Sequence, residues 1–214
     1  MPKAIIFDLD GTVIDTERTV WVDSYIHLLR LYNLEDKREN LKHLTMGAKF
    51  EESTRILYDF YKIQDSFENF FENRRRLVQK GFAENVAFMD GFEEFYQRLG
   101  NRKKAIATSM DEKFLKLTLG HLPLRSFFGE HIYIVADAGG KSKPHPDIFL
   151  YAAKKIDESP ENCIVIEDAP KGITAAKNAG MKAIALTTSV SEEHFPHADH
   201  IVSSFSEITD AMLQ

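Results

Sequence analysis

The motif Asp-Leu-Asp-Gly-Thr at positions 8–12, directly after a short apolar run, is the feature that most constrains the fold. The run at positions 4–7 is typical of a strand buried on both faces of a parallel sheet. Because strand side chains alternate, Asp8 and Asp10 are expected to point to the same side at the carboxyl end of this strand, where open α/β sheets bind ligands. Two carboxylates this close are costly unless a cation lies between them or one is protonated. A strand that runs into an ordinary Asp-Gly turn would look the same locally, so the other motifs discriminate between the two interpretations.

Composition narrows the class of protein. The 214 residues can form one full domain or a domain with a small insert, and a hydrophobic content of 43% is ample for a core. A net charge of −6 argues against a protein that binds nucleic acids or membrane surfaces. The single cysteine, Cys163, excludes a disulfide framework, fits a reducing compartment, and lies in an apolar run where we expect it to be buried. No apolar run approaches a membrane span, and the first residues predict a core strand rather than a signal peptide, so we expect a cytoplasmic protein.

A helical insert follows the first strand. Apolar residues recur at helical spacing near positions 21–32, 50–61 and 67–78, and nothing between residues 17 and 88 looks like a βαβ unit. The sequence therefore predicts a helical cap at residues 17–88, and an α/β core formed by residues 1–16 plus 89–214. Arg74 takes a position in the apolar stripe of the third helix. The run Arg74-Arg75-Arg76 could bind an anion, although a solvated helix face is favoured.

From residue 91 onwards, strands and helices alternate, which predicts a parallel, doubly wound sheet. The predicted strands lie at about 104–108, 132–135, 163–166, 182–186 and 201–202. Helices are predicted near 92–99, 114–122, 148–156 and 173–179, with a short terminal helix that bears Ile208 and Met212.

Polar residues occur at or after the carboxyl ends of several predicted strands. Besides the first motif, they are Thr108 and Ser109, the pair Glu167-Asp168, and Lys143 in a turn-rich loop. The carboxyl ends of a doubly wound sheet share one edge, so these residues can meet there. Carboxylates beside a hydroxyl and a lysine make a hard-cation site, and Mg²⁺ in such sites usually bridges to substrate phosphate. Each piece has an ordinary alternative, since the hydroxyls and acids could cap helices and the lysine could be an exposed loop residue, but their conjunction favours a site.

Taken in order, these motifs resemble those of the haloacid dehalogenase superfamily of phosphatases over nearly the whole chain. The matching segments are Asp-Leu-Asp-Gly-Thr at 8–12, Thr108, Lys143 in Lys-Pro-His-Pro-Asp-Ile-Phe, and Glu167-Asp168 in Ile-Glu-Asp-Ala-Pro-Lys-Gly. The last segment, Thr-Met-Gly at 45–47 and Asp-Thr-Glu-Arg at 15–18 are most similar to the subgroup of β-phosphoglucomutase and pseudouridine-5′-phosphatase. The resemblance implies a Rossmann-like core with a small α-helical cap.

The resemblance also implies roles for the core residues. Asp8 would attack phosphorus and form an aspartyl-phosphate, while Asp10 would protonate the leaving alcohol and then activate water. Thr108, Ser109 and Lys143 would bind the phosphoryl oxygens.

Mg²⁺ is the cofactor that the resemblance implies. Asp8, the backbone carbonyl of Asp10, and Asp168 would hold it, with Glu167 farther from the ion. Dehalogenases of the family replace the second aspartate of the first motif, so Asp10 points to phosphoryl transfer.

The expected function is hydrolysis of a small phosphorylated metabolite by a Mg²⁺-dependent, monomeric enzyme, with no nucleic-acid or membrane partner. A phosphosugar mutase is the alternative. That enzyme usually has a histidine near position 20 and an arginine shortly after the cap glycine, whereas this chain has Val20 and Lys49. A non-catalytic binding protein is a third possibility, disfavoured because binding alone does not need Asp10 as a proton donor. Candidates for contacting substrate from the cap are Glu17, Arg18, Lys49, Glu51 and Arg55.

Overall fold

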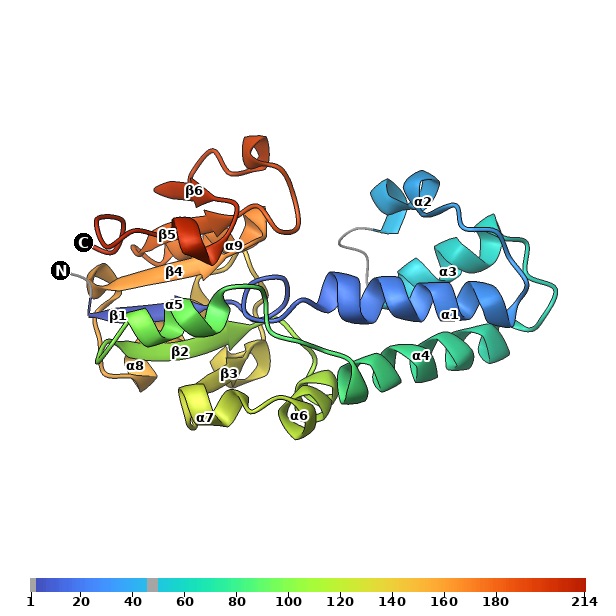
Figure 1. The fold of residues 1–214 in the computed structure, drawn as a ribbon, viewed down its shortest axis with the longest axis horizontal. Coiled ribbons are helices and arrows are strands. Elements are labelled where there is room, and N and C mark those ends of the chain that lie inside the picture. Colours follow the sequence, from blue (N-terminus) through green and yellow to red (C-terminus); the bar gives the residue numbers. More distant parts are fainter. Residues whose placement is uncertain (1–2, 46–49) are drawn as a thin grey trace.

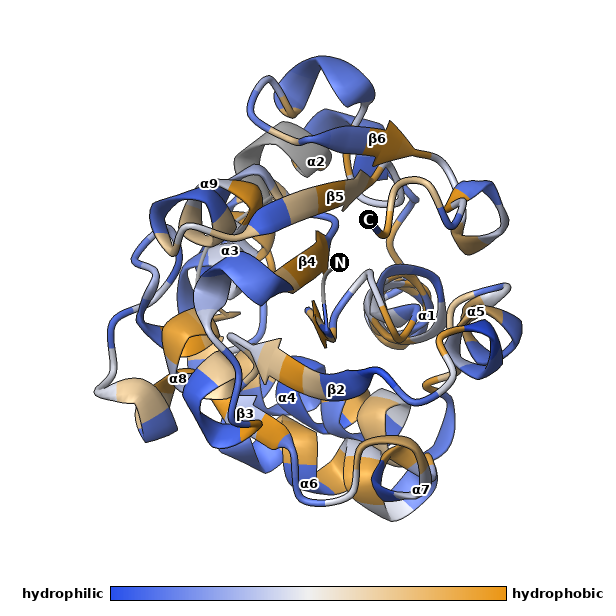
Figure 2. Cartoon of the chain, turned by 90° about the vertical axis from the view of Figure 1, so that its left-hand side faces the viewer, coloured by the Kyte–Doolittle hydropathy of each residue, from blue (hydrophilic) through white to orange (hydrophobic). Residues whose placement is uncertain are grey.

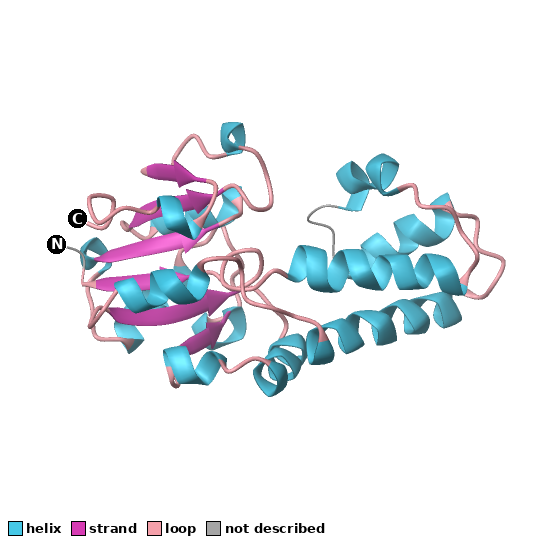
Figure 3. Ribbon diagram, viewed as in Figure 1, coloured by secondary structure: helices cyan, strands magenta, loops and turns pink. Residues whose placement is uncertain are grey.

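The computed structural model describes residues 3–45 and 50–214, and it consists of a sheet flanked by helices and a separate block of helices (Figures 1 and 3). Six parallel strands form the sheet in the order β3-β2-β1-β4-β5-β6. Their bounds are β1 (Ala4–Phe7), β2 (Lys103–Thr108), β3 (Ile132–Ile134), β4 (Cys163–Glu167), β5 (Lys182–Leu186) and β6 (His200–Val202). The prediction of a parallel, doubly wound sheet is therefore confirmed.

Strand β1 lies between β2 and β4. Phe7 is in register with Ile106 on one side and with Ile166 on the other. The chain continues from β1 into β2 and later crosses to β4 on the opposite side, so the topological switch point lies beside β1. Ligands of open α/β sheets bind at such a point. The first motif thus leaves the sheet at its centre, between the ends of β2 and β4.

The two faces of β1 are covered by different helices, which explains why its sequence is apolar throughout. Ile5 and Phe7 belong to one hydrophobic cluster with α5 (Phe92–Arg98) and α7 (Leu124–Phe128). Ala4 and Ile6 belong to another with α8 (Asp147–Lys155) and α9 (Pro170–Asn178). Figure 2 shows the central strand β4 coloured as hydrophobic, with surrounding helices that alternate between hydrophobic and hydrophilic stretches.

The helical block has its own apolar cluster, which contains the buried residues Leu28, Leu41, Leu57, Ile63 and Phe70. Its elements are the π-helical η1 (Glu17–Val22), α1 (Asp23–Leu31), α2 (Arg38–Thr45), α3 (Phe50–Phe60) and α4 (Phe67–Glu84). Ser66 caps α4 by accepting a hydrogen bond of 3.2 Å from the Asn69 N–H. Within the described residues no strand forms between β1 and β2. The division of the chain into a core and a cap domain stays a prediction.

Three aromatic side chains connect the helical block to the sheet region. We call this group, Trp21, Phe82 and Phe114, the aromatic joint. Phe82 of α4 contacts Trp21 with ring centroids 5.9 Å apart and stacks on Phe114 at 4.7 Å. Phe114 belongs to α6 (Glu112–His121) and packs against the hydrophobic cluster that contains Phe7 of β1. In Figure 1 the arrowheads of β2 and β4 point toward the helical block, and both termini lie at the far side. The carboxyl edge of the sheet therefore faces the block.

Three elements differ from the sequence expectation. Helices α2 and α7 were not predicted, because segments of eight and five residues are too short for a helical period to be recognised in the sequence. The predicted terminal helix is wrong, because the structure has a single 3₁₀ turn, η5 (Phe205–Glu207), followed by turns. Ile208 and Leu213 are nevertheless buried in the core. Their burial, rather than helix formation, accounts for the apolar pattern of this segment.

The solvated helix face predicted for the arginine run is wrong for Arg74. Its guanidinium donates to the Phe50 carbonyl at 3.1 Å and to Ser53 Oγ at 2.8 Å. Burial lowers the pKa of Arg74 to about 10. Arg74 therefore holds α4 against the start of α3, while Arg75 and Arg76 lie on the outer side of α4.

Among the described helices, none combines the length and the apolar character that crossing a bilayer would require.

Replacing Phe82 tests the aromatic joint. We expect Phe82→Ala to lower the free energy of unfolding by about 3–5 kcal/mol, because a buried ring is lost from a packed cluster. Phe60→Ala is the matched control, since Phe60 is 39% exposed, and it should cost about 0.5 kcal/mol. Urea unfolding followed by the fluorescence of Trp21, the single tryptophan, measures both variants. Similar losses in the two variants would contradict a joint at Phe82.

Candidate active site

A buried lysine joins the ends of β1 and β4. Lys143, in the loop before α8, donates hydrogen bonds to Asp8 and, at 2.8 Å, to Glu167 Oε1. Its side chain is only 7% exposed, so it is not an ordinary loop lysine. The Asp8 N–H donates to the Ile166 carbonyl at 2.9 Å, which ties the first residue after β1 to β4. The sheet edge thus brings these separate motifs together.

The turn after β1 needs its glycine. Gly11 adopts a φ of +73°, which L side chains rarely adopt. A Cβ at this position would also lie 2.2 Å from Oδ2 of Asp168. Thr12, the next residue, donates from Oγ1 to Asp168 Oδ1 at 3.0 Å. The turn therefore packs directly against the carboxylate that follows β4.

Burial raises the pKa of three aspartates in the site, Asp8, Asp10 and Asp168. Burial, reinforced by Glu167 and Asp168, raises the pKa of Asp8 although Lys143 opposes the shift. Burial likewise raises the pKa of Asp168 to about 7, with a further contribution from Glu167. Burial alone would lower the pKa of Lys143, but the carboxylates of Asp8 and Glu167 raise it overall, so the ammonium stays charged.

Asp10 differs from its neighbours in hydrogen bonding. Its Oδ1 atom is buried and has no hydrogen-bond partner in the described part of the chain. Burial raises the pKa of Asp10 to about 6, while a hydrogen bond with Thr16 opposes the shift. A carboxyl group with this pKa and a free oxygen can both donate and accept a proton near neutral pH.

The two hydroxyl residues at the carboxyl end of β2 are in different environments. Thr108 is buried, and its Oγ1 accepts a hydrogen bond of 2.9 Å from the Met110 N–H. Ser109 is exposed. Asp111 caps α6 by accepting from the Lys113 N–H at 2.8 Å, so Thr108 is not needed as the cap of that helix and can still donate its own proton.

Comparison with known proteins decides the family. The family model of the haloacid dehalogenase-like hydrolases matches residues 5–186, which include every core motif described above. The chain belongs to this family.

Two relatives and one solved structure illustrate the similarity. The chain is 30% identical to a phosphorylated carbohydrates phosphatase of Thermotoga maritima, over 85% of this chain and 83% of that protein. It is also 30% identical to the β-phosphoglucomutase of Bacillus subtilis, over 99% of this chain and 93% of the mutase. The crystal structure of a haloacid dehalogenase family hydrolase from Deinococcus radiodurans R1, with bound phosphate and sodium, has a TM-score of 0.82 at 25% identity and covers 98% of this chain and 94% of its own.

Two features of this haloacid dehalogenase-like site fit a bound cation. Asp8, Asp10, Glu167 and Asp168 bring four acids together around the single ammonium that the described residues contribute, Lys143. Asp10 Oδ1 is also buried and has no hydrogen-bond partner among the described residues. No group of three or more His, Cys, Asp or Glu side chains in residues 3–45 and 50–214 is placed to hold a metal by itself. Two carboxylates with a backbone carbonyl and water would nevertheless suffice for Mg²⁺, which keeps several waters in most protein sites.

Glu167 is engaged by other partners. Besides the ammonium of Lys143, it accepts a hydrogen bond of 2.5 Å from the Ala169 N–H, just before α9. Its predicted role near the metal stays a prediction, and its contacts favour holding Lys143 in place.

The predicted cap contacts are mostly exposed and have local partners. Arg18 pairs with Asp15 at 2.9 Å, and the Arg55 guanidinium packs over the ring of Phe67. Glu17 and Glu51 are exposed, and Lys49 lies outside the described residues. Contact of any of these five residues with substrate stays a prediction.

Two hydroxyl residues outside the predicted set contact the site from the loop after β5. Thr188 Oγ1 donates to the Gly11 carbonyl at 2.6 Å, and Ser189 Oγ donates to Asp168 Oδ2. The signal was present in the sequence, because Thr-Thr-Ser directly follows the fifth strand, and polar residues at strand ends were the basis for the other motifs.

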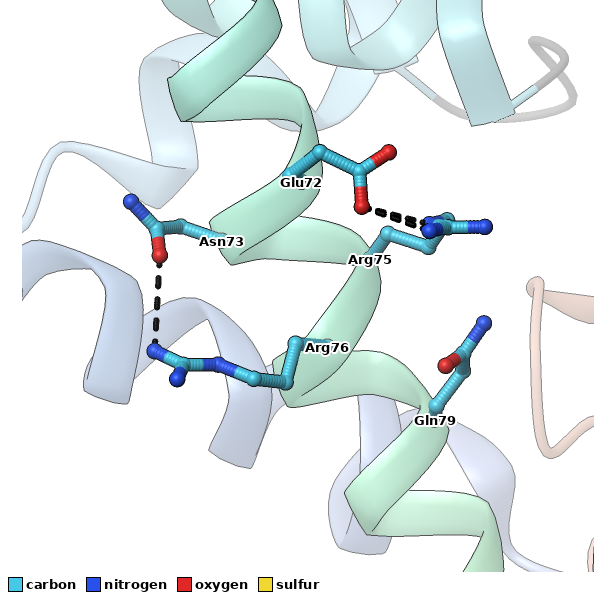
Figure 4. A pocket seen from close by; sticks show the side chains of 5 residues that line it. All are labelled: Glu72, Asn73, Arg75, Arg76 and Gln79. Carbon is cyan, nitrogen blue, oxygen red and sulfur yellow. Dashed lines mark hydrogen bonds and ion pairs between the residues drawn. The ribbon is translucent and has the colours of Figure 1, made fainter.

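Two hollows on the surface lie away from the acids Asp8, Asp10, Glu167 and Asp168. One of about 340 Å³ is lined by Glu72, Asn73, Arg75, Arg76 and Gln79, all from one side of α4 (Figure 4). Arg75 pairs with Glu72 at 2.5 Å and Arg76 donates to Asn73 at 3.4 Å. These charged groups already have partners, so the hollow gives no reason to place chemistry there.

Gly172 in α9 offers a test of the lysine–glutamate pair. A Cβ at Gly172 would lie 1.7 Å from Glu167 Oε1, and Glu167 is only 1% exposed, so Gly172→Ala must displace the carboxylate from Lys143. We expect a loss of about 3–5 kcal/mol in the free energy of unfolding, as for other broken buried pairs. Gly120→Ala in α6 is the matched control, since no atom lies within 4 Å of the added Cβ. That variant should gain about 0.5–1 kcal/mol from helix propensity. Urea unfolding measures both, and two stabilised variants would contradict a tightly packed Glu167.

Proposed function

We propose that this protein is a Mg²⁺-dependent phosphatase that hydrolyses a small phosphorylated metabolite through an aspartyl-phosphate. The observation that carries the proposal is the buried Lys143, held between Asp8 and Glu167 at the centre of the carboxyl edge. A cation fixed beside a carboxylate nucleophile suits a substrate that carries two negative charges.

The reaction takes two steps at Asp8. A carboxylate oxygen of Asp8 forms a bond to phosphorus as the bond from phosphorus to the substrate alcohol breaks, and Asp10 gives its proton to the leaving oxygen. Water then attacks the phosphorus of the aspartyl-phosphate, Asp10 takes a proton from that water, and phosphate leaves with Asp8 restored. A pKa of about 6 at Asp10 suits both its donor and its acceptor role.

The remaining charges are offset by residues of the same edge. Lys143 and the hydroxyls of Thr108 and Ser109 bind the phosphoryl oxygens. Mg²⁺, held by Asp8, the backbone carbonyl of Asp10, and Asp168, would neutralise charge on the phosphoryl group.

The oligomeric state and the cellular compartment of the enzyme are also proposals. Cys163 is free and buried, so the fold needs no disulfide and suits the reducing cytoplasm. We also infer that the enzyme is a monomer.

A phosphosugar mutase is the second candidate, favoured by the similarity to the Bacillus subtilis enzyme. A mutase must protect its aspartyl-phosphate from water until a sugar phosphate arrives. Val20 stands where the mutases usually have a histidine; it is buried and packs near Gly81, where an added Cβ would lie 2.9 Å from its Cγ1. Val20 therefore offers no hydrogen bond to a sugar, and hydrolysis is favoured.

Phosphate release from a panel of substrates tests the main proposal. We expect the purified protein to release phosphate from one or more sugar phosphates, polyol phosphates or nucleoside monophosphates in Mg²⁺, and to lose this activity in EDTA until Mg²⁺ is restored. Asp8→Asn should reduce the rate by a factor on the order of 10³ or more, because it removes the nucleophile. The same variant controls for contaminating phosphatases. Full activity in chelator, or in the Asp8→Asn variant, would contradict the mechanism.

A coupled assay separates hydrolase from mutase. We expect β-glucose 1-phosphate, if it is a substrate, to give inorganic phosphate and free glucose, because this sequence has Val20 and Lys49 in place of the histidine and arginine usual in the mutases. Catalytic glucose 1,6-bisphosphate should not divert the product to glucose 6-phosphate, which glucose-6-phosphate dehydrogenase detects. Added glucose 6-phosphate confirms that the coupling enzyme works. A strong signal that depends on the bisphosphate, with little phosphate released, would establish the mutase instead.

A further inference from the structure

The loop after β5 contacts two separate parts of the site. Thr188 Oγ1 donates to the Gly11 carbonyl at 2.6 Å, and Ser189 Oγ donates to Oδ2 of Asp168. Gly11 belongs to the turn after β1, whereas Asp168 follows β4. The loop after β5 therefore joins both of these segments to a third strand.

Asp168 is held from two sides. Its Oδ1 accepts a hydrogen bond of 3.0 Å from Thr12, and its Oδ2 accepts the one from Ser189. With one bond to each oxygen, the carboxylate cannot rotate freely about its terminal bond. Because each carboxylate oxygen can accept two bonds, each also keeps a site for a further ligand.

Close packing at Gly11 maintains this arrangement. A Cβ at Gly11 would lie 2.8 Å from Ser189 Oγ, as well as 2.2 Å from Asp168 Oδ2. The contact between the serine and the aspartate therefore fills the space that the glycine leaves. Such a hydrogen bond to a ligating carboxylate fixes its orientation and typically strengthens metal binding.

We propose that Ser189 is a positioning residue that orients the Asp168 carboxylate toward Mg²⁺. The inference rests on the proposed function, which makes Asp168 a ligand of that ion. Ser189 acts through Asp168 and touches neither the substrate nor the metal.

The position suits a clean substitution. Ser189 is exposed as a residue although its hydroxyl meets the buried carboxylate, so removing one oxygen leaves no cavity in the core. Ser191, two residues on, provides the matched control. It is also exposed, and its hydroxyl lies 3.3 Å from His194 Nδ1, away from Asp168.

The experiment measures Mg²⁺ binding rather than turnover. Isothermal titration of Mg²⁺ into the full-length protein gives its dissociation constant for wild type, Ser189→Ala, Ser189→Thr and Ser191→Ala. We expect Ser189→Ala to weaken binding by roughly tenfold or more, as for other lost contacts to metal ligands. Ser189→Thr keeps the hydroxyl and Ser191→Ala keeps the contact, so both should bind Mg²⁺ as the wild type does. Melting in EDTA should be the same for all four proteins.

The outcomes distinguish this inference from the function on which it rests. If the wild-type protein binds Mg²⁺ and the dissociation constant of Ser189→Ala is within twofold of the wild-type value, the role of Ser189 is overturned. The proposed function is not affected by that result. A melting temperature that falls in EDTA for Ser189→Ala but not for Ser189→Thr would show that the hydroxyl supports the fold, and would overturn the positioning role as well. Wild-type protein that binds no Mg²⁺ would overturn both this inference and the metal dependence proposed above.

Discussion

The ion pair of Lys143 with Asp8 and Glu167 is the interaction on which the site depends, because it makes the burial of neighbouring carboxylates tolerable. A buried charge without a partner is strongly destabilising, so breaking either side of the pair costs more than forming it gains. The pair requires β1 and β4 to be adjacent and the loop before α8 to fold over their ends. Sheet order and loop conformation are therefore constrained by the same electrostatics that prepare the site for an anionic substrate.

The charge of Lys143 does not neutralise all four acids of the site, Asp8, Asp10, Glu167 and Asp168. The raised pKa values of Asp8, Asp10 and Asp168 show that burial opposes their charged forms. A sheet buried on both faces supplies the rigidity that holds these groups together despite this cost. The same cost favours a cation ligand, because a bound cation would stabilise the ionised carboxylates and with them the folded state.

The sequence predicted the features that follow from a single repeating rule. Parallel strands share one carboxyl edge, so Asp8, Lys143 and Glu167 could be placed together without coordinates. The same rule places Ser189 near this edge, but its contact with Asp168 depends on how the loop after β5 bends. The partners of Arg74 likewise depend on which helix packs beside α4. The terminal segment failed for a similar reason, since burial of Ile208 by tertiary contacts imitates a helical pattern.

The two aspartates of the first motif, Asp8 and Asp10, are held by different parts of the backbone. Asp8 is bonded through its N–H to β4, within the sheet. Asp10 lies in a turn in which the Gly11 N–H donates to the Ile14 carbonyl at 2.8 Å, and Ile14 in turn forms an antiparallel bridge with Phe88. Phe88 belongs to the segment that returns from the helical block. A displacement of that block would therefore be transmitted first to the turn that carries Asp10, while Asp8 stays fixed by the strands on either side of it.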